Sequence, residues 1–208
     1  MREQTIDAFL AALAGRSAAP GGGAAAALQV AAAAALLAMV ARYSDGPKYS
    51  ADADEIGWVL EQAERVRESC TDLIDADTAA FGAVADAYKL PKDTAELAEA
   101  RTAAIAAALT EAAEPPAAVI KAGGRLIELA EILRPIGNRN VIADVAAAAE
   151  TIRAGVAIAN INVHVNLRGI TDAAARARFT EATEHAHHVA AKAAEVSAAV
   201  LADLRSAR

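Results

Sequence analysis

The chain has 208 residues, enough for one domain, and 55% of them are hydrophobic, most of these being alanine. Its net charge of -7, without any basic run, argues against nonspecific nucleic-acid binding. Aromatic residues make up only 3%, and because small side chains each bury little area, stability requires long helix interfaces. The composition predicts one domain over residues 1–208, an all-α bundle of long antiparallel helices with no sheet, and it favours an oligomer.

Cysteine usage and the first residues bear on where the protein works. Cys70 is the only cysteine, so no disulfide can form within the chain, which fits a reducing cytoplasm. The first fifteen residues lack the layout of a signal peptide. Residues 24–41 carry no charge and approach the length of a membrane span, but alanine drives membrane insertion only weakly. We interpret them as a buried helix and expect a cytoplasmic protein that binds no membrane.

Helix-breaking residues divide the chain into segments whose apolar residues recur mostly at helical spacing. Glycine, proline or aspartate residues cluster at 15–23, 44–50 and 90–94, and these clusters mark turns. Asp93 or Thr94 is suited to cap the helix that follows the last cluster. The expected helices, in chain order, are 3–14, 24–43, 52–88, 94–113, a segment ending near 133, an asparagine-rich helix ending at 167, and 172–205.

Two features of this assignment have alternative interpretations. Pro115 and Pro116 can either kink one long helix or start a second helix that abuts the first. Residues 160–167 alternate strictly between polar and apolar, which is typical of a strand, but no other stretch alternates as well and could pair with it. We therefore interpret them as helix, which places Asn162 and Asn166 one turn apart on the same face.

The sequence PGGG at 20–23 precedes the apolar helix. Gly21, Gly22 and Gly23 allow backbone N–H groups to approach a ligand, and a helix N-terminus favours a carboxylate or phosphate. The sequence is not a nucleotide-binding P-loop, because no Gly-Lys-Ser or Gly-Lys-Thr follows. The alternative is a helix entry in which the glycines only permit close packing.

The segment 137–166 sets one acid and several carboxamides among apolar residues. Such groups cost free energy unless each finds a hydrogen-bond partner. Asp144 stands between Ile142 and Val145, so its carboxylate should be paired or functional; the alternative is that it is solvated or binds neighbouring backbone. The asparagines of this segment are Asn138, Asn140, Asn160, Asn162 and Asn166.

A group of histidines and glutamates near the C-terminus has part of a metal motif. Glu184 and His187 have the Glu-x-x-His spacing of di-iron bundles, but such a site needs a second pair of this kind on another helix. His164, the histidine outside this group, has no such partner. We interpret the group as a solvated helix face and expect no metal.

Together these motifs resemble the cyclodeaminase/cyclohydrolase family, which includes the C-terminal domain of formiminotransferase-cyclodeaminase and bacterial methenyltetrahydrofolate cyclohydrolases. The resemblance spans nearly the whole chain, and it implies an all-helical homodimer with a folate pocket at or near the subunit interface. The family often has Ser or Thr after the three glycines, where this chain has Ala24. The matching residues are 20–23, Lys48-Tyr49, Asp77 with Ala80-Phe81, 90–92, Arg101, 111–115, 137–138 with Asn140 and Asp144, and Asn162 with 166–167.

The resemblance implies a tetrahydrofolate derivative as substrate. A cyclohydrolase adds water to the N5–C–N10 amidinium of 5,10-methenyltetrahydrofolate and gives 10-formyltetrahydrofolate, whereas a cyclodeaminase forms the same cation from 5-formiminotetrahydrofolate and releases ammonia. Both reactions need a carboxylate near the cation and a proton acceptor. We expect Asp144 to be this carboxylate, with Asn138 and Asn140 orienting water or the ring. Asn162 and Asn166 are suited to read the edge of the pterin.

The folate tail is anionic and the protein is acidic, so local cations should attract the tail. Lys48, Lys92 and Arg139 are the candidates, together with the N–H groups of the glycine loop; the alternative is that these cations are only solvated. The expected substrate-binding residues are Gly21, Gly22, Gly23, Lys48, Tyr49, Asp77, Arg139, Asn162 and Asn166.

Asp144 and Asn162 are eighteen residues apart, about 27 Å along a straight helix, so one small head group cannot contact both within one chain. Either the two ends bind different parts of a long folate, or an antiparallel partner helix brings Asn162 of one subunit to Asp144 of the other. A non-catalytic folate-binding or anion-binding bundle and a structural helical protein are the competing functions. A stand-alone chain without a formiminotransferase domain favours the cyclohydrolase reaction over the cyclodeaminase reaction.

Overall fold

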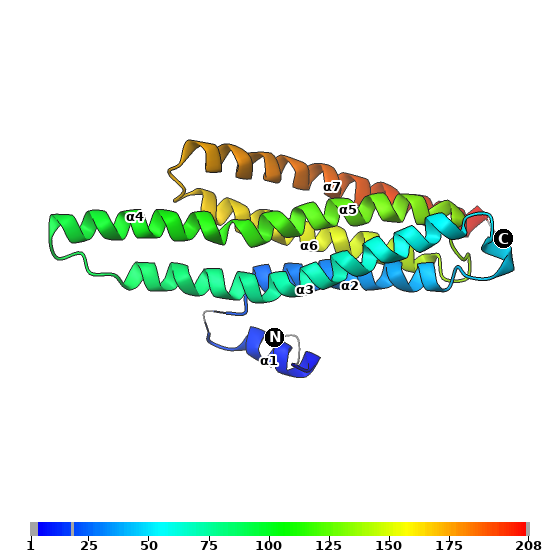
Figure 1. Cartoon of the computed structure of the whole chain (residues 1–208), viewed down its shortest axis with the longest axis horizontal. Helices are drawn as coiled ribbons and strands as arrows, with labels where there is room; N and C mark the ends of the chain where they lie inside the picture. The colour runs from blue at the N-terminus through cyan, green and yellow to red at the C-terminus, as the bar shows by residue number, and fades with distance from the viewer. Residues whose placement is uncertain (1–3, 18, 207–208) are drawn as a thin grey trace.

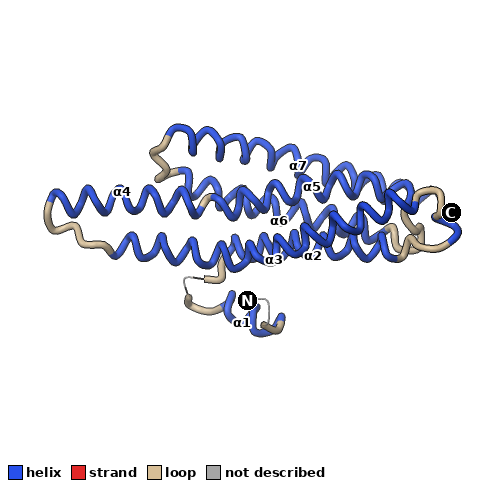
Figure 2. Tube along the Cα trace, in the orientation of Figure 1, coloured by secondary structure: helices blue, strands red, loops and turns tan. Residues whose placement is uncertain are grey.

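The computed structural model describes residues 4–17 and 19–206, which form seven α-helices and one 3₁₀ turn and contain no strand (Figure 1, Figure 2). The prediction of an all-α bundle is confirmed, and residues 160–167 lie in a helix. The helices are α1 (Ile6–Ala14), α2 (Gly22–Arg42), α3 (Ala53–Lys89), α4 (Ala95–Ala112), α5 (Glu114–Ile136), α6 (Ala143–Leu167) and α7 (Ala173–Ser206), with the 3₁₀ turn at Pro47–Tyr49.

Capping residues and prolines set the helix boundaries. Thr94 caps α4, as predicted, because its Oγ1 accepts a hydrogen bond of 3.2 Å from the backbone N–H of Leu97. Pro115 and Pro116 lie in the first turn of α5, so the chain forms two abutting helices and not one kinked helix. Pro135 lies inside the last turn of α5, which continues slightly beyond its predicted end.

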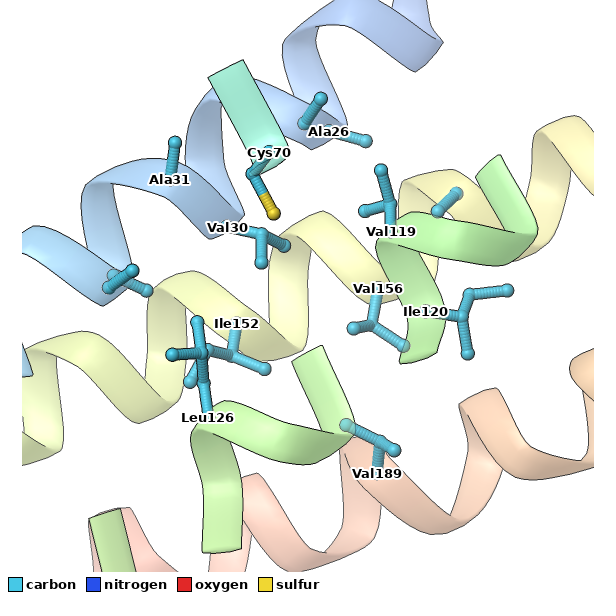
Figure 3. Close-up of a cluster of buried hydrophobic side chains, with 14 of the residues drawn as sticks. Ala26, Val30, Ala31, Cys70, Val119, Ile120, Leu126, Ile152, Val156 and Val189 are labelled. Atoms are coloured by element: carbon cyan, nitrogen blue, oxygen red, sulfur yellow. The ribbon is translucent and has the colours of Figure 1, made fainter. Parts of the chain in front are cut away.

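The core consists of small side chains on closely packed helices. The alanine-rich α2 packs against α3, α5 and α6. A Cβ at Gly155 of α6 would stand 2.9 Å from a Val30 methyl carbon and 3.0 Å from the Ala26 carbonyl oxygen, so only glycine allows α2 and α6 to approach this closely. Around this contact, Val30, Ile152 and other aliphatic side chains interdigitate (Figure 3). Close approach of the helices thus gives a dense core to a chain with few aromatic residues.

One pair of helices extends beyond the rest. The C-terminal half of α3 and all of α4 form a two-helix arm, which reaches past the ends of α6 and α7 (Figure 1). Arg101 of α4 donates hydrogen bonds of 3.0 and 3.3 Å to the carbonyl oxygen of Tyr88 on α3. Because the last carbonyls of a helix lack partners within it, this guanidinium caps α3 from the neighbouring helix. We call this pair the α3–α4 arm; its base lies beside the C-terminal end of α6.

By length and composition alone, two stretches are apolar enough to cross a membrane, Gly22–Arg42 and Ala95–Ile136. The core helix of a soluble protein meets the same criteria. In the first stretch, 61% of the most apolar window is buried inside the bundle. This burial agrees with the interpretation of residues 24–41 as a buried helix.

Candidate functional site

Half of the predicted site residues meet around one cavity at the start of α2. The cavity, which we call the glycine pocket, has a volume of about 180 Å³. The loop before α2, the middle of α3 and the C-terminal part of α6 form its walls, because α2 runs between the other two helices. The predicted residues that it brings together are Gly21, Gly22, Gly23, Asp77, Asn162 and Asn166.

Asp77 provides the carboxylate of the glycine pocket. It accepts a hydrogen bond from the backbone N–H of Ala24 in the first turn of α2, whose N-cap residue, Gly21, has no side chain for this purpose. Burial raises the pKa of Asp77 above its ordinary value, and the hydrogen bond from Ala24 opposes this rise. A half-buried carboxyl with a raised pKa in a cavity can accept and return a proton more readily than a solvated aspartate.

The three glycines have different surroundings. A Cβ at Gly23 would overlap the Oδ1 and Cγ atoms of Asp77, so this glycine makes room for the carboxylate. A Cβ at Gly22 would stand 3.4 Å from Nδ2 of Asn162, whereas none of the described residues lies within 4 Å of one at Gly21. Ala24 is fully buried and reaches Asp77 through its backbone, so the departure from the family pattern changes a side chain inside the core.

Asn162 and Asn166 lie one turn apart on α6, as predicted, and both line the glycine pocket. The Nδ2 atom of Asn162 donates a hydrogen bond of 2.9 Å to the carbonyl oxygen of Ile158. The Nδ2 atom of Asn166 donates one of 2.9 Å to the carbonyl oxygen of Ala112. Because both nitrogens are engaged, the Oδ1 atoms are the acceptors that these amides can offer. Together with Asp77 they suit a ligand that carries N–H groups or positive charge.

A larger cavity adjoins the glycine pocket at the base of the α3–α4 arm. This arm cavity has a volume of about 450 Å³ and shares Phe81, Val165 and Asn166 with the glycine pocket. Its wall is mostly apolar, and Tyr88 and Arg168 lie along it. The two adjoining cavities can therefore hold an elongated ligand with its head in the glycine pocket and its tail toward Arg168.

Asn138, in the loop before the N-terminal end of α6, has hydrogen-bond partners at both ends of its amide. Asn138 donates through Nδ2 to the carbonyl oxygen of Tyr43 at 2.6 Å, and its Oδ1 accepts the backbone N–H of Asn140 at 3.0 Å. Its own backbone N–H donates to Oγ of the buried Ser44 at 2.8 Å. The Nδ2 atom and the backbone N–H of Asn138 thus join the loop after α5 to the end of α2, while its Oδ1 holds Asn140 in its own loop, which is a structural role.

The remaining predicted residues lie near Asn138. Lys48 and Tyr49 belong to the 3₁₀ turn, where the Lys48 Nζ lies 5.5 Å from the centre of the Tyr49 ring, and Tyr49 lines a separate cavity of about 250 Å³. Arg139 is exposed and donates at 3.3 Å to the carbonyl oxygen of Arg134. Asp144 is half-buried in the first turn of α6, where a negative charge interacts favourably with the helix dipole.

The predicted site is therefore divided between the two ends of α6. Asp144 and Asn162 lie on this one helix, and their separation along it is about 27 Å, as expected from the sequence. Within one chain, the structure brings the glycines and Asp77 to Asn162, and it does not bring Asp144 to them. Asp77, and not Asp144, is the carboxylate in the same cavity as the glycine loop.

Several residues that line the two cavities were not among the expected substrate-binding residues, although Phe81 and Ala112 lie in segments that carry the family resemblance. Phe81 follows Asp77 by one helical turn, so the helical period places the two on the same face of α3. Val165 and Arg168 flank Asn166 near the end of α6, and Ala112 belongs to another helix. The turn spacing was a usable signal for Phe81. Residue spacing alone does not place Ala112 in the cavity wall, because its position depends on how α4 meets α6.

The described residues contain no group of three or more histidine, cysteine, aspartate or glutamate side chains arranged to hold a metal ion. His185 and His188 of α7 have ring centroids 6.5 Å apart, and a Cβ at Gly124 of α5 would stand 2.7 Å from Nε2 of His185. Cys70 is fully buried in the core, and burial raises the pKa of its thiol to about 12. This thiol is therefore a packing group.

The fold and the glycine pocket define the class of protein, an all-helical bundle with a cavity between its helices whose carboxylate and amide oxygens can accept hydrogen bonds. The model of the formiminotransferase-cyclodeaminase family matches residues 5–185, and the chain belongs to this family.

Three relatives illustrate this family. The chain is 37% identical to the methenyltetrahydrofolate cyclohydrolase of Methylorubrum extorquens over 82% of this chain and 83% of that protein. It is 32% identical to the formimidoyltransferase-cyclodeaminase of Rattus norvegicus over 88% of this chain, but it spans only 33% of that protein. The formiminotetrahydrofolate cyclodeaminase of Thermotoga maritima has the same fold, with a TM-score of 0.86, 28% identity and 98% coverage of both chains.

Proposed function

We propose that the protein hydrolyses 5,10-methenyltetrahydrofolate to 10-formyltetrahydrofolate. The relative named for this activity is similar over most of both chains. The observation that carries the proposal is the half-buried Asp77 carboxylate, which faces the same cavity as Asn162 and Asn166. A cationic amidinium ring with N–H groups on its pterin edge is the kind of ligand that these acceptors bind.

Asp77 can act in both steps of this hydrolysis. The carboxylate stabilises the positive charge of the N5–C–N10 bridge and accepts a proton from a water molecule as the water oxygen bonds to the bridging carbon. The product of this step is a neutral carbinolamine. The carbon–N5 bond then breaks while the carbonyl forms, N5 takes the proton held by Asp77, and the hydroxyl proton passes to solvent. The raised pKa of Asp77 favours its role as proton carrier.

The arm cavity is the place for the rest of the folate. Its apolar wall, with Phe81 and Tyr88, suits the aminobenzoyl ring, and Arg168 can attract the anionic tail. Of the cations expected to bind the tail, Lys48 and Arg139 lie at the other end of the bundle within one chain. Arg168 therefore takes their place in this proposal.

Decay of the methenyltetrahydrofolate absorbance measures the proposed activity. We expect Asp77→Asn to slow hydrolysis about 100- to 10,000-fold, the range for loss of a general acid–base group. Asp144→Asn is the matched variant, and it tests the prediction that Asp144 is the catalytic carboxylate. An Asp77→Asn enzyme as fast as the wild type rules out this mechanism. Calorimetry then shows whether folate still binds, which separates a non-catalytic folate-binding bundle from a structural one.

A homodimer would give Asp144 a place in the same mechanism. An antiparallel partner can bring Asp144 of one subunit to the glycine pocket of the other, and Ile161 and Val165 of α6 are 62% and 58% exposed in the single chain. Mixing Asp77→Asn with Asp144→Asn protein tests this arrangement. Recovery of activity in the mixture supports a shared site, because each mixed dimer keeps one site with both carboxylates.

The cyclodeaminase reaction is the second candidate, and the similarity to the Thermotoga maritima protein over 98% of both chains favours it. It starts from 5-formiminotetrahydrofolate, forms the same bridged cation and expels ammonia. Ammonia release from this substrate by the purified protein, compared with its rate of methenyltetrahydrofolate hydrolysis, decides between the two reactions.

A further inference from the structure

The joint between α4 and α5 leaves a buried backbone carbonyl without a helical partner. In an α-helix the carbonyl oxygen of Ala112 would accept the N–H of residue 116, but Pro116 has none. Pro115 likewise offers no N–H to the carbonyl of Glu111, but the helical bonds resume beyond the prolines, since the Ala117 N–H donates to Ala113 at 3.2 Å. Ala112 is only 8% exposed, so its carbonyl needs a donor from elsewhere in the protein.

Asn166 supplies this donor from α6, with its Nδ2 atom 2.9 Å from the Ala112 oxygen. The Ala112 carbonyl fixes the orientation of the Asn166 amide, because two acceptor oxygens, Oδ1 and the carbonyl oxygen, would repel each other at this distance. Asn166 lies where the glycine pocket meets the arm cavity, and its Oδ1 accepts no hydrogen bond from residues 4–17 or 19–206. The acceptor end of the amide is thus left for a ligand.

We propose that Pro116 fixes the hydrogen-bonding polarity of the ligand site through Asn166. The missing N–H of Pro116 frees the Ala112 carbonyl, this carbonyl holds the Asn166 amide by its nitrogen, and Oδ1 then requires an N–H donor on the ligand. Asn166 is the specificity-determining residue and Pro116 a positioning residue. The inference rests on the proposed function, which supplies a pterin ring whose edge carries donors at N3 and at the 2-amino group.

Calorimetry with small probes tests this requirement without the reaction. The probes are tetrahydropterin, an analogue with methyl in place of the 2-amino group, and an analogue methylated at N3. We expect the wild type to bind one of the two analogues about tenfold or more weakly than tetrahydropterin, because that analogue leaves Oδ1 without a donor.

Pro116→Ala is the decisive variant and Pro115→Ala its matched control. Both prolines are buried in the same turn, so both changes remove a similar amount of packing. The alanine at 116 offers an N–H to Ala112 and releases the Asn166 amide, whereas the alanine at 115 offers one to Glu111, which is exposed. We expect Pro116→Ala to reduce the discrimination to about threefold or less and Pro115→Ala to keep it near the wild-type value of about tenfold.

A second measurement follows the amide itself. In the folded protein the side-chain N–H signals of Asn166 should exchange slowly with solvent, and Pro116→Ala, but not Pro115→Ala, should speed this exchange. Equal effects of the two variants on discrimination or on exchange overturn the inference, and so does a wild type that binds all three probes equally. If no probe binds at all, both the inference about Pro116 and the proposed function fail. If the probes bind but are not discriminated, the proposed function stands and only the role of Pro116 is removed.

Discussion

The two ends of α6 use the same chemistry for different purposes. At its N-terminal end, Asn138 has both ends of its amide engaged by the backbone of Tyr43 and Asn140. At its C-terminal end, Asn162 and Asn166 donate through their nitrogens, and among the described residues no donor is bonded to their oxygens, which lie at a cavity beside Asp77. The comparison shows that a polar residue in apolar surroundings signals function only where the protein leaves part of it unsatisfied.

Apart from replacing the Asp77 carboxylate itself, the largest expected effect on activity is at Gly23. In Gly23→Ala the new methyl group overlaps Asp77, so the carboxylate must move and activity should fall about 100-fold, the loss expected from a displacement of about 1 Å. Gly21→Ala is the control, because a Cβ there meets no atom of residues 4–17 or 19–206 within 4 Å. The rate of methenyltetrahydrofolate hydrolysis is the measurement. Equal losses in the two variants would contradict a specific role for the Gly23–Asp77 contact.

The stability of alanine variants should distinguish the two ends of α6, because Asn138 has a structural role and Asn162 lines the cavity. Asn138→Ala removes two exposed hydrogen bonds between loops, which water replaces only in part, and should lower the free energy of unfolding by about 0.5–1.5 kcal/mol. Asn162→Ala loses a bond to its own helix and gains helix propensity, so its unfolding free energy should change by less than about 0.5 kcal/mol. Urea denaturation gives both values, and a larger loss for Asn162→Ala would reverse the comparison.

Asp77→Asn should stabilise the protein although it slows hydrolysis. Because the folded-state pKa of Asp77 is raised above the ordinary value of 3.8, the folded protein holds this proton more tightly than the unfolded chain. Ionisation therefore costs stability, and the cost appears as the pH rises from about 3.8 through the raised pKa. At neutral pH we expect a melting temperature about 2–4 °C higher than that of the wild type. The difference should disappear below about pH 4, and a constant difference at all pH values would exclude this cause.

The smallest effect concerns the ion pairs that join α5 to α7 at each end. Glu114 pairs with Arg178 near the glycine pocket, where both side chains are about half exposed, and Arg134 pairs with Asp203 at 2.7 Å at the other end. Arg178→Ala should lower the unfolding free energy by less than about 1 kcal/mol, because water and salt screen exposed charges. Arg134→Ala breaks a more buried pair and should cost more. Thermal unfolding in low and high salt tests the ranking.

Sequence patterns were sufficient for the elements of the fold. Thr94, the proline pair and the glycine-containing turns all mark helix ends through local chemistry, which a sequence displays directly. The strand-like alternation at 160–167 was correctly set aside, since an isolated strand has no hydrogen-bond partner. The local signals therefore agreed with the global fold.

The candidate site was only partly accessible to such reasoning. The sequence indicated Asp77, Asn162 and the glycines as separate motifs, and their meeting depends on the antiparallel packing of α2 between α3 and α6. The role of Asn138 could not be foreseen, because its partner Tyr43 is ninety-five positions away along the chain. Which amides are satisfied is a property of tertiary contacts, and no local pattern records it.

The alanine-rich interface of α2 limits how this chain can vary. A glycine in place of a buried alanine such as Ala27 lowers helix propensity by about 1 kcal/mol, and a larger side chain such as valine overpacks the interface at a cost of about 1–3 kcal/mol. Alanine already has the highest helix propensity, so replacement by either a smaller or a larger residue destabilises α2, the helix that follows the glycine loop. We expect the spectrum of tolerated substitutions along the buried face of α2 to be far narrower than along the exposed α4.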